Sequence, residues 1–251
     1  MPSDAGSSVG AMRVVELWRY PVKSMQGERL DAAEIGAQGI VGDRQWAIVD
    51  GTTGLALTAR REPALLFAAA RRNDDDTVTI DLPDGSTAMS DDDLSRWLGR
   101  PVSLQRAGTA GTYEIAVDFE DEAGSEWVQW TGPDDTFHDS ARARVSILST
   151  GSIRDWDRRR FRANVIVDGE DGEEDRLVGS QVAVGGCRLD IVKAIDRCVM
   201  TTRPQPGGIE RDLDVLRTIN AERRSLLAVG AGVVTTGAVA VGDEVVDAPP
   251  A

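Results

Sequence analysis

Short segments that alternate apolar and polar residues, separated by turns rich in glycine and aspartate, constrain the fold of this chain more than any other feature. Residues 12–20 and 77–82 are two examples of the alternation expected in a half-buried β-strand, and residues 182–184 and 189–194 are expected to pair as a hairpin. About a dozen such segments stand against three expected helices, without βα alternation. The sequence therefore predicts an α+β, mainly β fold, not a doubly wound nucleotide-binding sheet.

Three segments are predicted to be helical, namely residues 90–98, 152–159 and 212–224. The first begins with Ser90, whose hydroxyl can cap the first turn. Three aspartates follow it, where the helix dipole favours negative charge. Residues 65–71 are apolar and alanine-rich, and we expect a strand there because the neighbouring segments are strands.

A glycine- and acid-rich stretch, residues 107–137, divides the strand-rich sequence into two halves. It carries isolated tryptophans and no recognisable motif, so we interpret it as a variable connecting segment that forms part of a pocket rim. We therefore expect an N-terminal domain over residues 12–106 and a C-terminal domain over residues 138–247. Residues 1–11 and 248–251 are expected to be flexible tails.

The net charge of −14 argues against one class of partner. Binding to a nucleic-acid backbone depends on a basic surface, so we expect no nucleic-acid partner. The sequence shows neither the start of a signal peptide nor an apolar run long enough to span a bilayer, and we expect a soluble, cytoplasmic protein. Arginines and lysines nevertheless recur in the motif-like segments described below, which suggests a site that holds a small anion.

Two cysteines and one histidine limit the metal chemistry open to the chain's own side chains. Cys187, Cys198 and His138 are too few for an ordinary structural zinc site, which uses four Cys or His ligands. Cys198 directly follows Arg197, and a neighbouring positive charge favours the thiolate, which is both a nucleophile and a ligand for soft metals. The alternative is a buried cysteine that only packs, and this stretch alone does not decide between the two.

Six segments, taken together, resemble the MOSC family, which consists of molybdenum-cofactor domains with an N-terminal β-barrel domain attached. They are Tyr-Pro-Val-Lys-Ser at 20–24, Gly-Asp-Arg-Gln-Trp at 42–46, Thr-Ala-Arg-Arg-Glu-Pro at 58–63, Phe-Arg-Ala-Asn-Val-Ile-Val at 161–167, Arg-Cys-Val-Met-Thr-Thr at 197–202 and the closing stretch 237–243. Each segment alone is a weak signal, and their order and spacing carry the resemblance. It implies an N-terminal β-barrel-like domain packed on a β-rich barrel with few helices.

The resemblance also implies a bound molybdenum cofactor, whose metal is held by a pterin dithiolene and by one protein thiolate, here Cys198. Thiolate is the soft, strongly donating ligand that suits such a metal. The pterin carries a phosphate, so its site needs cations and N–H donors. The implied cofactor-binding residues are Lys23, Ser24, Arg44, Arg162, Asn164, Arg197, Thr201 and Thr202. For each cation, the alternative is a surface side chain that pairs with one of the many carboxylates.

Phe-His-Asp-Ser at 137–140 resembles the family segment that brings an aspartate near the metal. Asp139 is therefore the candidate for relaying protons to a departing oxygen, and a role as the cap of a turn is an equal alternative. His138 could act as a base, although a lone histidine is more often structural. Cys187 matches no family motif and is expected to be a packed strand residue.

The similarity to amidoxime-reducing members implies an oxidoreductase that reduces an N-hydroxylated small molecule, such as a hydroxylamine, an N-hydroxylated base or an amidoxime. The chain has no cysteine cluster for an iron–sulfur centre, so electrons would come from a separate ferredoxin-like or flavin reductase. The competing hypothesis is a carrier of the cofactor, or a module that passes sulfur to it through a Cys198 persulfide, partnered with a pyridoxal-phosphate-dependent desulfurase. A third hypothesis is a Cys–His hydrolase or transferase built from Cys198 and His138.

Overall fold

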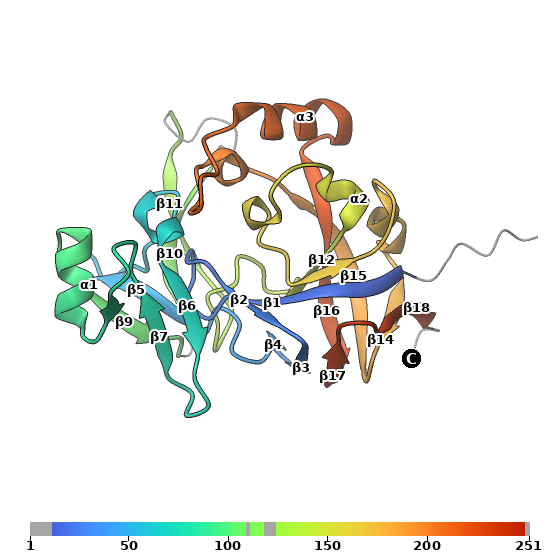
Figure 1. The fold of residues 1–251 in the computed structure, drawn as a ribbon, viewed down its shortest axis with the longest axis horizontal. Helices are drawn as coiled ribbons and strands as arrows, with labels where there is room; N and C mark the ends of the chain where they lie inside the picture. Colours follow the sequence, from blue (N-terminus) through green and yellow to red (C-terminus); the bar gives the residue numbers. More distant parts are fainter. Residues whose placement is uncertain (1–11, 109–110, 118–123, 249–251) are drawn as a thin grey trace, which may run out of the picture.

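The structure is a computed structural model that describes residues 12–108, 111–117 and 124–248 (Figure 1). Within these residues seven strands close into a barrel, and the fold is mostly β, as the sequence predicts. The order around the barrel is β13 (Val165–Val167), β12 (Val145–Ser149), β16 (Leu226–Thr235), β15 (Cys187–Asp196), β14 (Gln181–Val184), β18 (Glu244–Ala248) and β1 (Met12–Arg19). β1 pairs with β13 to close the ring, and β2 (Glu28–Leu30) pairs with the end of β1.

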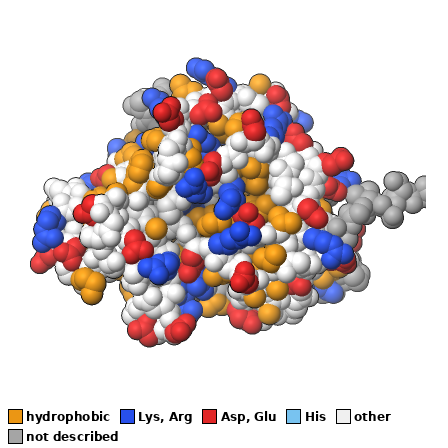
Figure 2. Space-filling model, in the orientation of Figure 1, with side chains coloured by type: hydrophobic (Ala, Val, Ile, Leu, Met, Phe, Trp, Pro, Cys, Tyr) orange, Lys and Arg blue, Asp and Glu red, His pale blue; other side chains and the backbone are white. Residues whose placement is uncertain are grey.

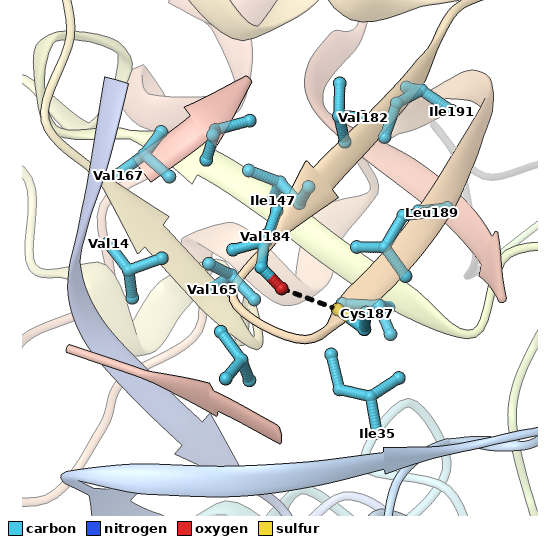
Figure 3. Close-up of a cluster of buried hydrophobic side chains, with 14 of the residues drawn as sticks. Val14, Ile35, Ile147, Val165, Val167, Val182, Val184, Cys187, Leu189 and Ile191 are labelled. Carbon is cyan, nitrogen blue, oxygen red and sulfur yellow. Dashed lines mark hydrogen bonds between the residues drawn. The ribbon is translucent and has the colours of Figure 1, made fainter. Parts of the chain in front are cut away.

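Apolar side chains from these strands fill the barrel (Figure 3). Ile147, Val165 and Ile191 are buried there, because every second side chain of a strand points to the same face of the sheet. Cys187 belongs to this cluster: it is 2% exposed, and its thiol donates a hydrogen bond to the carbonyl oxygen of Val184 at 3.0 Å. Burial raises the pKa of this thiol to about 11. The expectation that Cys187 packs in a strand is confirmed.

The N-terminal half, at the left of Figure 1, forms smaller sheets around a second core. Its pairs and sheets are β5 (Trp46–Asp50) with β9 (Val102–Arg106), β6 (Ala69–Arg72) with β7 (Val78–Asp81) and β8 (Thr87–Ala88), and β10 (Thr112–Ala116) with β11 (Trp127–Thr131). Met25, Ile48 and Leu65 are fully buried in this second core, which the β5–β9 pair and the β6–β7–β8 sheet cover. The hairpin β10–β11 comes from the stretch for which the sequence predicts no element.

Two strand pairings connect the halves. β1 comes from the N-terminus and yet belongs to the barrel, where Leu17 lies opposite Val165 of β13. β17 (Gly237–Ala240) comes from near the C-terminus and pairs with β3 (Ala32–Gly36), which also pairs with β4 (Gly39–Ile40). Main-chain hydrogen bonds therefore join the two halves, and a cavity between them has walls from both.

Two of the predicted helices lie where the sequence places them. Helix α1 (Asp91–Leu98) is capped by Ser90, whose hydroxyl accepts a hydrogen bond from the N–H of Asp93 at 3.3 Å. Gly99 ends this helix in the left-handed region, which a glycine adopts without strain. Helix α3 (Leu213–Arg223) covers nearly all of the third predicted segment.

Two local predictions are wrong in extent. The helix predicted over residues 152–159 is the single turn α2 (Thr150–Ile153), because Arg154 leaves the helical region at a φ of 57°. Residues 65–71, predicted as one strand, finish the short helix η1 (Pro63–Phe67) before the chain enters β6. The other single turns are η2 (Arg158–Arg160), η3 (Glu173–Leu177) and η4 (Val199–Thr202). Over the ranges that the structure describes, every helix is too short or too polar to cross a membrane.

Candidate functional site

A cavity of about 410 Å³ lies where the two halves meet, and residues of both halves line it. Nine of the ten side chains predicted from the sequence are part of its wall: Lys23, Ser24, Arg44, Asp139, Arg162, Asn164, Arg197, Cys198 and Thr201. Thr202 is the tenth and is buried behind the wall. The fold thus brings the scattered segments of the sequence to one place.

The cavity is basic although the chain is acidic. Eight lysines and arginines line it against three carboxylates, in a chain of net charge −14. The eight cations are Lys23, Arg44, Arg60, Arg144, Arg160, Arg162, Lys193 and Arg197, and the carboxylates are Glu114, Asp139 and Asp196. On the molecular face shown in Figure 2, by contrast, acidic and basic side chains are interleaved. The cavity therefore concentrates positive charge, which favours the binding of an anion.

Cys198 lies between the end of β15 and the single turn η4, with an extended backbone (φ −128°, ψ −179°). Its side chain is partly exposed, in contrast to the buried Cys187, and it lines the cavity. The hydroxyl of Thr201 donates to the carbonyl oxygen of Cys198 at 3.0 Å, and that of Thr202 donates to the carbonyl oxygen of Val199 at 2.8 Å. The two threonines thus hold the turn that presents the thiol, and only Thr201 reaches the cavity.

Arg197 supplies a positive charge beside that thiol. Its Nε donates to the carbonyl oxygen of Leu227 at 2.8 Å, and one terminal nitrogen donates to that of Phe161 at 3.0 Å. The other terminal nitrogen is buried and has no hydrogen-bond partner among the described residues. Burial lowers the pKa of Arg197 to about 10, and the neighbouring Cys198 opposes that shift. A buried guanidinium N–H without an acceptor is a position at which an anionic ligand oxygen would bind.

Arg160 fixes the loop that follows Cys198, and the sequence analysis did not single it out. One terminal nitrogen donates to the carbonyl oxygens of Thr201 at 3.1 Å and Arg203 at 3.2 Å, and the other donates to that of Glu210 at 2.8 Å. Arg160 is buried, and these three bonds hold the backbone of the loop from residue 201 to residue 210 in place. The available signal was the run of four arginines in residues 158–162.

Lys23 is buried and lies against Asp139. Its Nζ donates to Asp139 Oδ1 at 2.7 Å and to the carbonyl oxygen of Phe137 at 2.9 Å, and it lies 3.9 Å from the centre of the Tyr113 ring. Burial lowers the pKa of Lys23, and Asp139 opposes that shift. Lys23 therefore depends on the Asp139 carboxylate for its charge, which a surface lysine does not.

The Asp139 carboxylate is part of the cavity wall, and its side chain is 82% exposed. Enclosure by the protein alone would raise the pKa of this carboxyl. Lys23 and the hydrogen bonds from Lys23 and Tyr113 outweigh that effect and hold the pKa well below its usual range. Asp139 is therefore ionised at neutral pH.

Arg44 and Arg162 lie over the same ring, that of Tyr20, with guanidinium carbons 4.9 Å and 4.5 Å from its centre. Arg44 is paired with the buried Asp43, whereas Arg162 donates to the carbonyl oxygen of Met25. Burial and the nearby Arg44 lower the pKa of Arg162 to about 10. Both arginines have φ values above 50°, a conformation that costs free energy in a non-glycine residue and is often found at functional sites.

Asn164 and Ser24 hold the scaffold beneath these cations. The amide oxygen of Asn164 accepts from the N–H and the hydroxyl of Ser146 at 3.2 Å and 3.0 Å. Its amide nitrogen donates to the carbonyl oxygen of Trp18 at 3.2 Å and to Asp43 Oδ2 at 3.1 Å, so the amide is fully used within the protein. The hydroxyl of Ser24 accepts from the N–H of Ala59 at 2.9 Å and keeps its own hydrogen for a ligand.

His138, the single histidine of the sequence, is buried beside Asp43, with its Nε2 at 3.7 Å from Asp43 Oδ2. Burial lowers the pKa of His138 to about 3, so the imidazole is neutral. No hydrogen bond joins it to Cys198 in the part of the chain that the structure describes. A histidine with so low a pKa is a poor base for a thiol, and the geometry gives no support to a Cys–His hydrolase.

The low pKa of His138 predicts an acid-sensitive fold. Its pKa falls from 6.5 in the unfolded chain to about 3 in the folded protein. Between these pH values the unfolded chain binds a proton that the folded protein does not bind. The free energy of unfolding therefore keeps this contribution above pH 6.5 and loses it as the pH falls below 6.5. The loss amounts to about 3 kcal/mol at about pH 4.5. We expect His138→Gln to lose less stability than the wild type between these pH values in urea unfolding. Parallel losses in both proteins would exclude His138 as the cause.

Comparison with known proteins accounts for this arrangement. Residues 11–129 match the MOSC N-terminal beta barrel domain, and residues 134–246 match the MOSC domain. The chain belongs to the MOSC family. The two matches together cover nearly all of the barrel and the N-terminal sheets, and every residue of the cavity wall except Trp130. The first match includes β10 and part of β11, the hairpin that lies within the predicted connecting segment.

This MOSC protein is similar to curated proteins of two kinds. Mitochondrial amidoxime reducing component 2 of Bos taurus is 28% identical, over 84% of this chain and 72% of the relative. Mitochondrial amidoxime-reducing component 1 of Homo sapiens is 26% identical, also over 84% and 72%. Molybdenum cofactor sulfurase of Drosophila willistoni is 26% identical over 87% of this chain, which corresponds to 30% of that relative.

Proposed function

We propose that this MOSC protein binds the molybdenum cofactor and reduces N-hydroxylated small molecules. The observation that carries the proposal is a partly exposed thiol, Cys198, in the wall of a cavity. Eight lysine and arginine side chains line this cavity, although the chain as a whole is acidic. A soft sulfur donor and a basic surround are what a metal with an anionic organic ligand requires. Relatives named amidoxime-reducing components support the choice of reaction.

The residues present fit such a cofactor. Cys198 would supply the protein ligand to the metal, and the unpartnered terminal nitrogen of Arg197 would donate a hydrogen bond to an anionic oxygen. Lys23, Ser24, Arg44 and Arg162 line the wall and would complete the contacts to the phosphate and the pterin. Asn164 would act indirectly, since its amide bonds are already used to hold this wall together.

When bound, the cofactor would supply the two-electron chemistry that removes oxygen from nitrogen. The N–O bond of the substrate breaks, two electrons and two protons are consumed, and an amine (or amidine) and water form. The electrons would come from a separate ferredoxin-like or flavin-containing reductase. The protein's own part is to bind the cofactor, to orient the substrate and to handle protons.

Asp139 is the side chain best placed for that last task. Because it is ionised, it acts first as a hydrogen-bond acceptor that orients the N-hydroxyl group of the substrate. It can then pass on a proton received from solvent, since its carboxylate is open to the cavity. Lys23 keeps the carboxylate charged between turnovers through the 2.7 Å bond to Oδ1.

The decisive experiment combines composition with turnover. Protein produced in a host that makes the cofactor should contain molybdenum and pterin in near-equal amounts. With a chemical reductant such as dithionite-reduced viologen, it should convert an amidoxime to the amidine with matching consumption of two electrons. Protein that is replete in metal and pterin but inactive on hydroxylamines, N-hydroxylated bases and amidoximes would rule out the reductase.

The sulfurase relative favours one alternative, in which this chain carries the cofactor or passes sulfur to it. Cys198 would then hold a persulfide, formed when a pyridoxal-phosphate-dependent desulfurase transfers a sulfur atom to the thiolate. Mass spectrometry distinguishes the two functions. A sulfur atom added to Cys198 in metal-free protein, without turnover of any N-hydroxylated compound, would favour the carrier.

A further inference from the structure

The hairpin β10–β11 places a tyrosine against the candidate proton-handling group. Tyr113 is 1% exposed, and its strand is fixed to the N-terminal half by the hydrogen bond from the N–H of Ala56 to the carbonyl oxygen of Thr112 at 2.8 Å. Gly111, two residues earlier, packs so closely on the ring of Phe137 that a Cβ at this position would lie 2.2 Å from a ring carbon. The position of Tyr113 is therefore closely determined.

The hydroxyl of Tyr113 lies 2.9 Å from Asp139 Oδ1 and 3.0 Å from the carbonyl oxygen of His138. A phenol has one hydrogen to donate, and a carboxylate is a stronger acceptor than a carbonyl. The bond to Asp139 is therefore the favoured one. Burial and the neighbouring Asp139 raise the pKa of Tyr113, so the phenol keeps its proton and remains a donor.

Lys23 completes a three-residue arrangement. Its ammonium group donates to the same oxygen of Asp139 at 2.7 Å and lies 3.9 Å from the centre of the Tyr113 ring. A cation over an aromatic face is attracted by the ring. Tyr113 therefore holds both Lys23 and Asp139 in place. Both donors, Lys23 and Tyr113, bind Oδ1, and Oδ2 accepts no hydrogen bond from the described residues.

We propose that Tyr113 is a positioning residue that, together with Lys23, fixes Oδ1 of Asp139 so that Oδ2 alone is presented to the substrate. This inference rests on the proposed function for the role of Asp139, but its geometry does not. The 107–137 segment thereby gains a function that its sequence does not show: the hairpin sets the orientation and charge of a residue in the other half of the protein. The charged and titratable groups around Asp139 are Lys23, Arg44, Arg60, Tyr113, His138 and Arg162.

The test is Tyr113→Phe, which keeps the ring and the packing and removes only the hydroxyl. A lost hydrogen bond to the ionised carboxylate raises the pKa of Asp139, because that bond favours the charged form. At neutral pH the carbon NMR signal of the Asp139 carboxyl, identified by its loss in Asp139→Asn, should shift in the variant, because Oδ1 loses one of its two hydrogen-bond donors. This readout needs neither the cofactor nor turnover.

In the loaded protein, we expect Tyr113→Phe to keep its molybdenum and pterin and its KM, while kcat falls about 10- to 100-fold. In an Asp139→Asn background the same substitution should change kcat less than about twofold, since the two residues act as a unit. Ile115→Val is the matched control: it changes the same strand and the same cavity wall, has no polar group that could bond Asp139, and should leave the Asp139 signal and kcat in place.

An unchanged Asp139 carboxyl signal in Tyr113→Phe at neutral pH would overturn the inference, even if the protein reduces N-hydroxylated substrates. An equal loss of kcat with and without the Asp139 carboxylate would do the same. Conversely, a shifted Asp139 carboxyl signal in a protein that turns over no N-hydroxylated compound would leave the geometry supported and the proposed function refuted.

Discussion

Cys198→Ser should lose molybdenum before it loses pterin, and reductase turnover should fall more than about 100-fold. Even the outer partners of metal ligands are worth about 10- to 100-fold, so loss of the ligand itself should exceed that range. A serine hydroxyl stays protonated at neutral pH and is a hard donor, whereas the thiolate is soft and anionic. The cations of the cavity wall remain in the variant, and they would retain the pterin for longer than the metal.

Elemental analysis and pterin fluorescence on the purified variant measure the two losses separately. Cys187→Ala is the matched control, because Cys187 is the other thiol and lies in the barrel core, away from the cavity wall. It should keep the full metal content and lose only modest stability. If Cys198→Ser holds as much molybdenum as the wild type, the metal is not bound through this sulfur and the proposed function fails with it.

Structural elements that depend on residues close together in the sequence could be predicted from it. The Ser90 cap, the hairpin of β14 and β15, and helix α3 depend on neighbours a few residues away, and all three lie where expected. The single turn α2 shows the limit of this approach. Its end depends on the backbone conformation of Arg154, which pairs with Asp171 and Glu222 in distant segments, and no local pattern specifies that contact.

Residues of the site could be predicted where a motif carried them, and not where only the fold brings them together. Cys198, Lys23 and Asp139 stand in recognisable segments, and the fold gathers them in one cavity wall. Tyr113 and Arg160 stand in no motif. Their contacts to Asp139 and to the loop after Cys198 span 26 and 41 to 50 residues and exist only after the strands have paired. Sequence spacing gives no information on such contacts.

The role of Asn164 illustrates the same limit in a residue that a motif did identify. The resemblance implied a contact with the cofactor, but the amide of Asn164 bonds Ser146, Trp18 and Asp43. Its place in the motif is equally explained by the need to hold β1, β12 and the Asp43 turn together. Residue type and position in a motif therefore indicate that a residue matters to the site, while only the contacts show whether it binds a ligand or supports the wall.

The second large effect is expected at Asp43, which is 1% exposed beneath the cavity. Its carboxylate accepts from the N–H of Tyr20 at 2.7 Å, from the amide of Asn164 at 3.1 Å and from the guanidinium of Arg44. Asp43→Ala would leave Arg44 charged and buried without a counter-ion. Breaking a buried pair in this way costs about 3–5 kcal/mol, so we expect the variant to unfold at much lower urea concentration with an unchanged m-value.

Asp81→Ala is the matched control for that loss, because Asp81 pairs with the exposed Arg71 at 3.0 Å. Water screens an exposed pair, and its removal should cost less than about 1 kcal/mol. A second comparison separates charge from packing: in an Arg44→Met background the cation that pairs with Asp43 is gone, and the further change Asp43→Ala should cost clearly less than it does alone. Equal costs in the two backgrounds would show that Asp43 stabilises the protein through its bonds to Tyr20 and Asn164. The cations above it would then not depend on its charge.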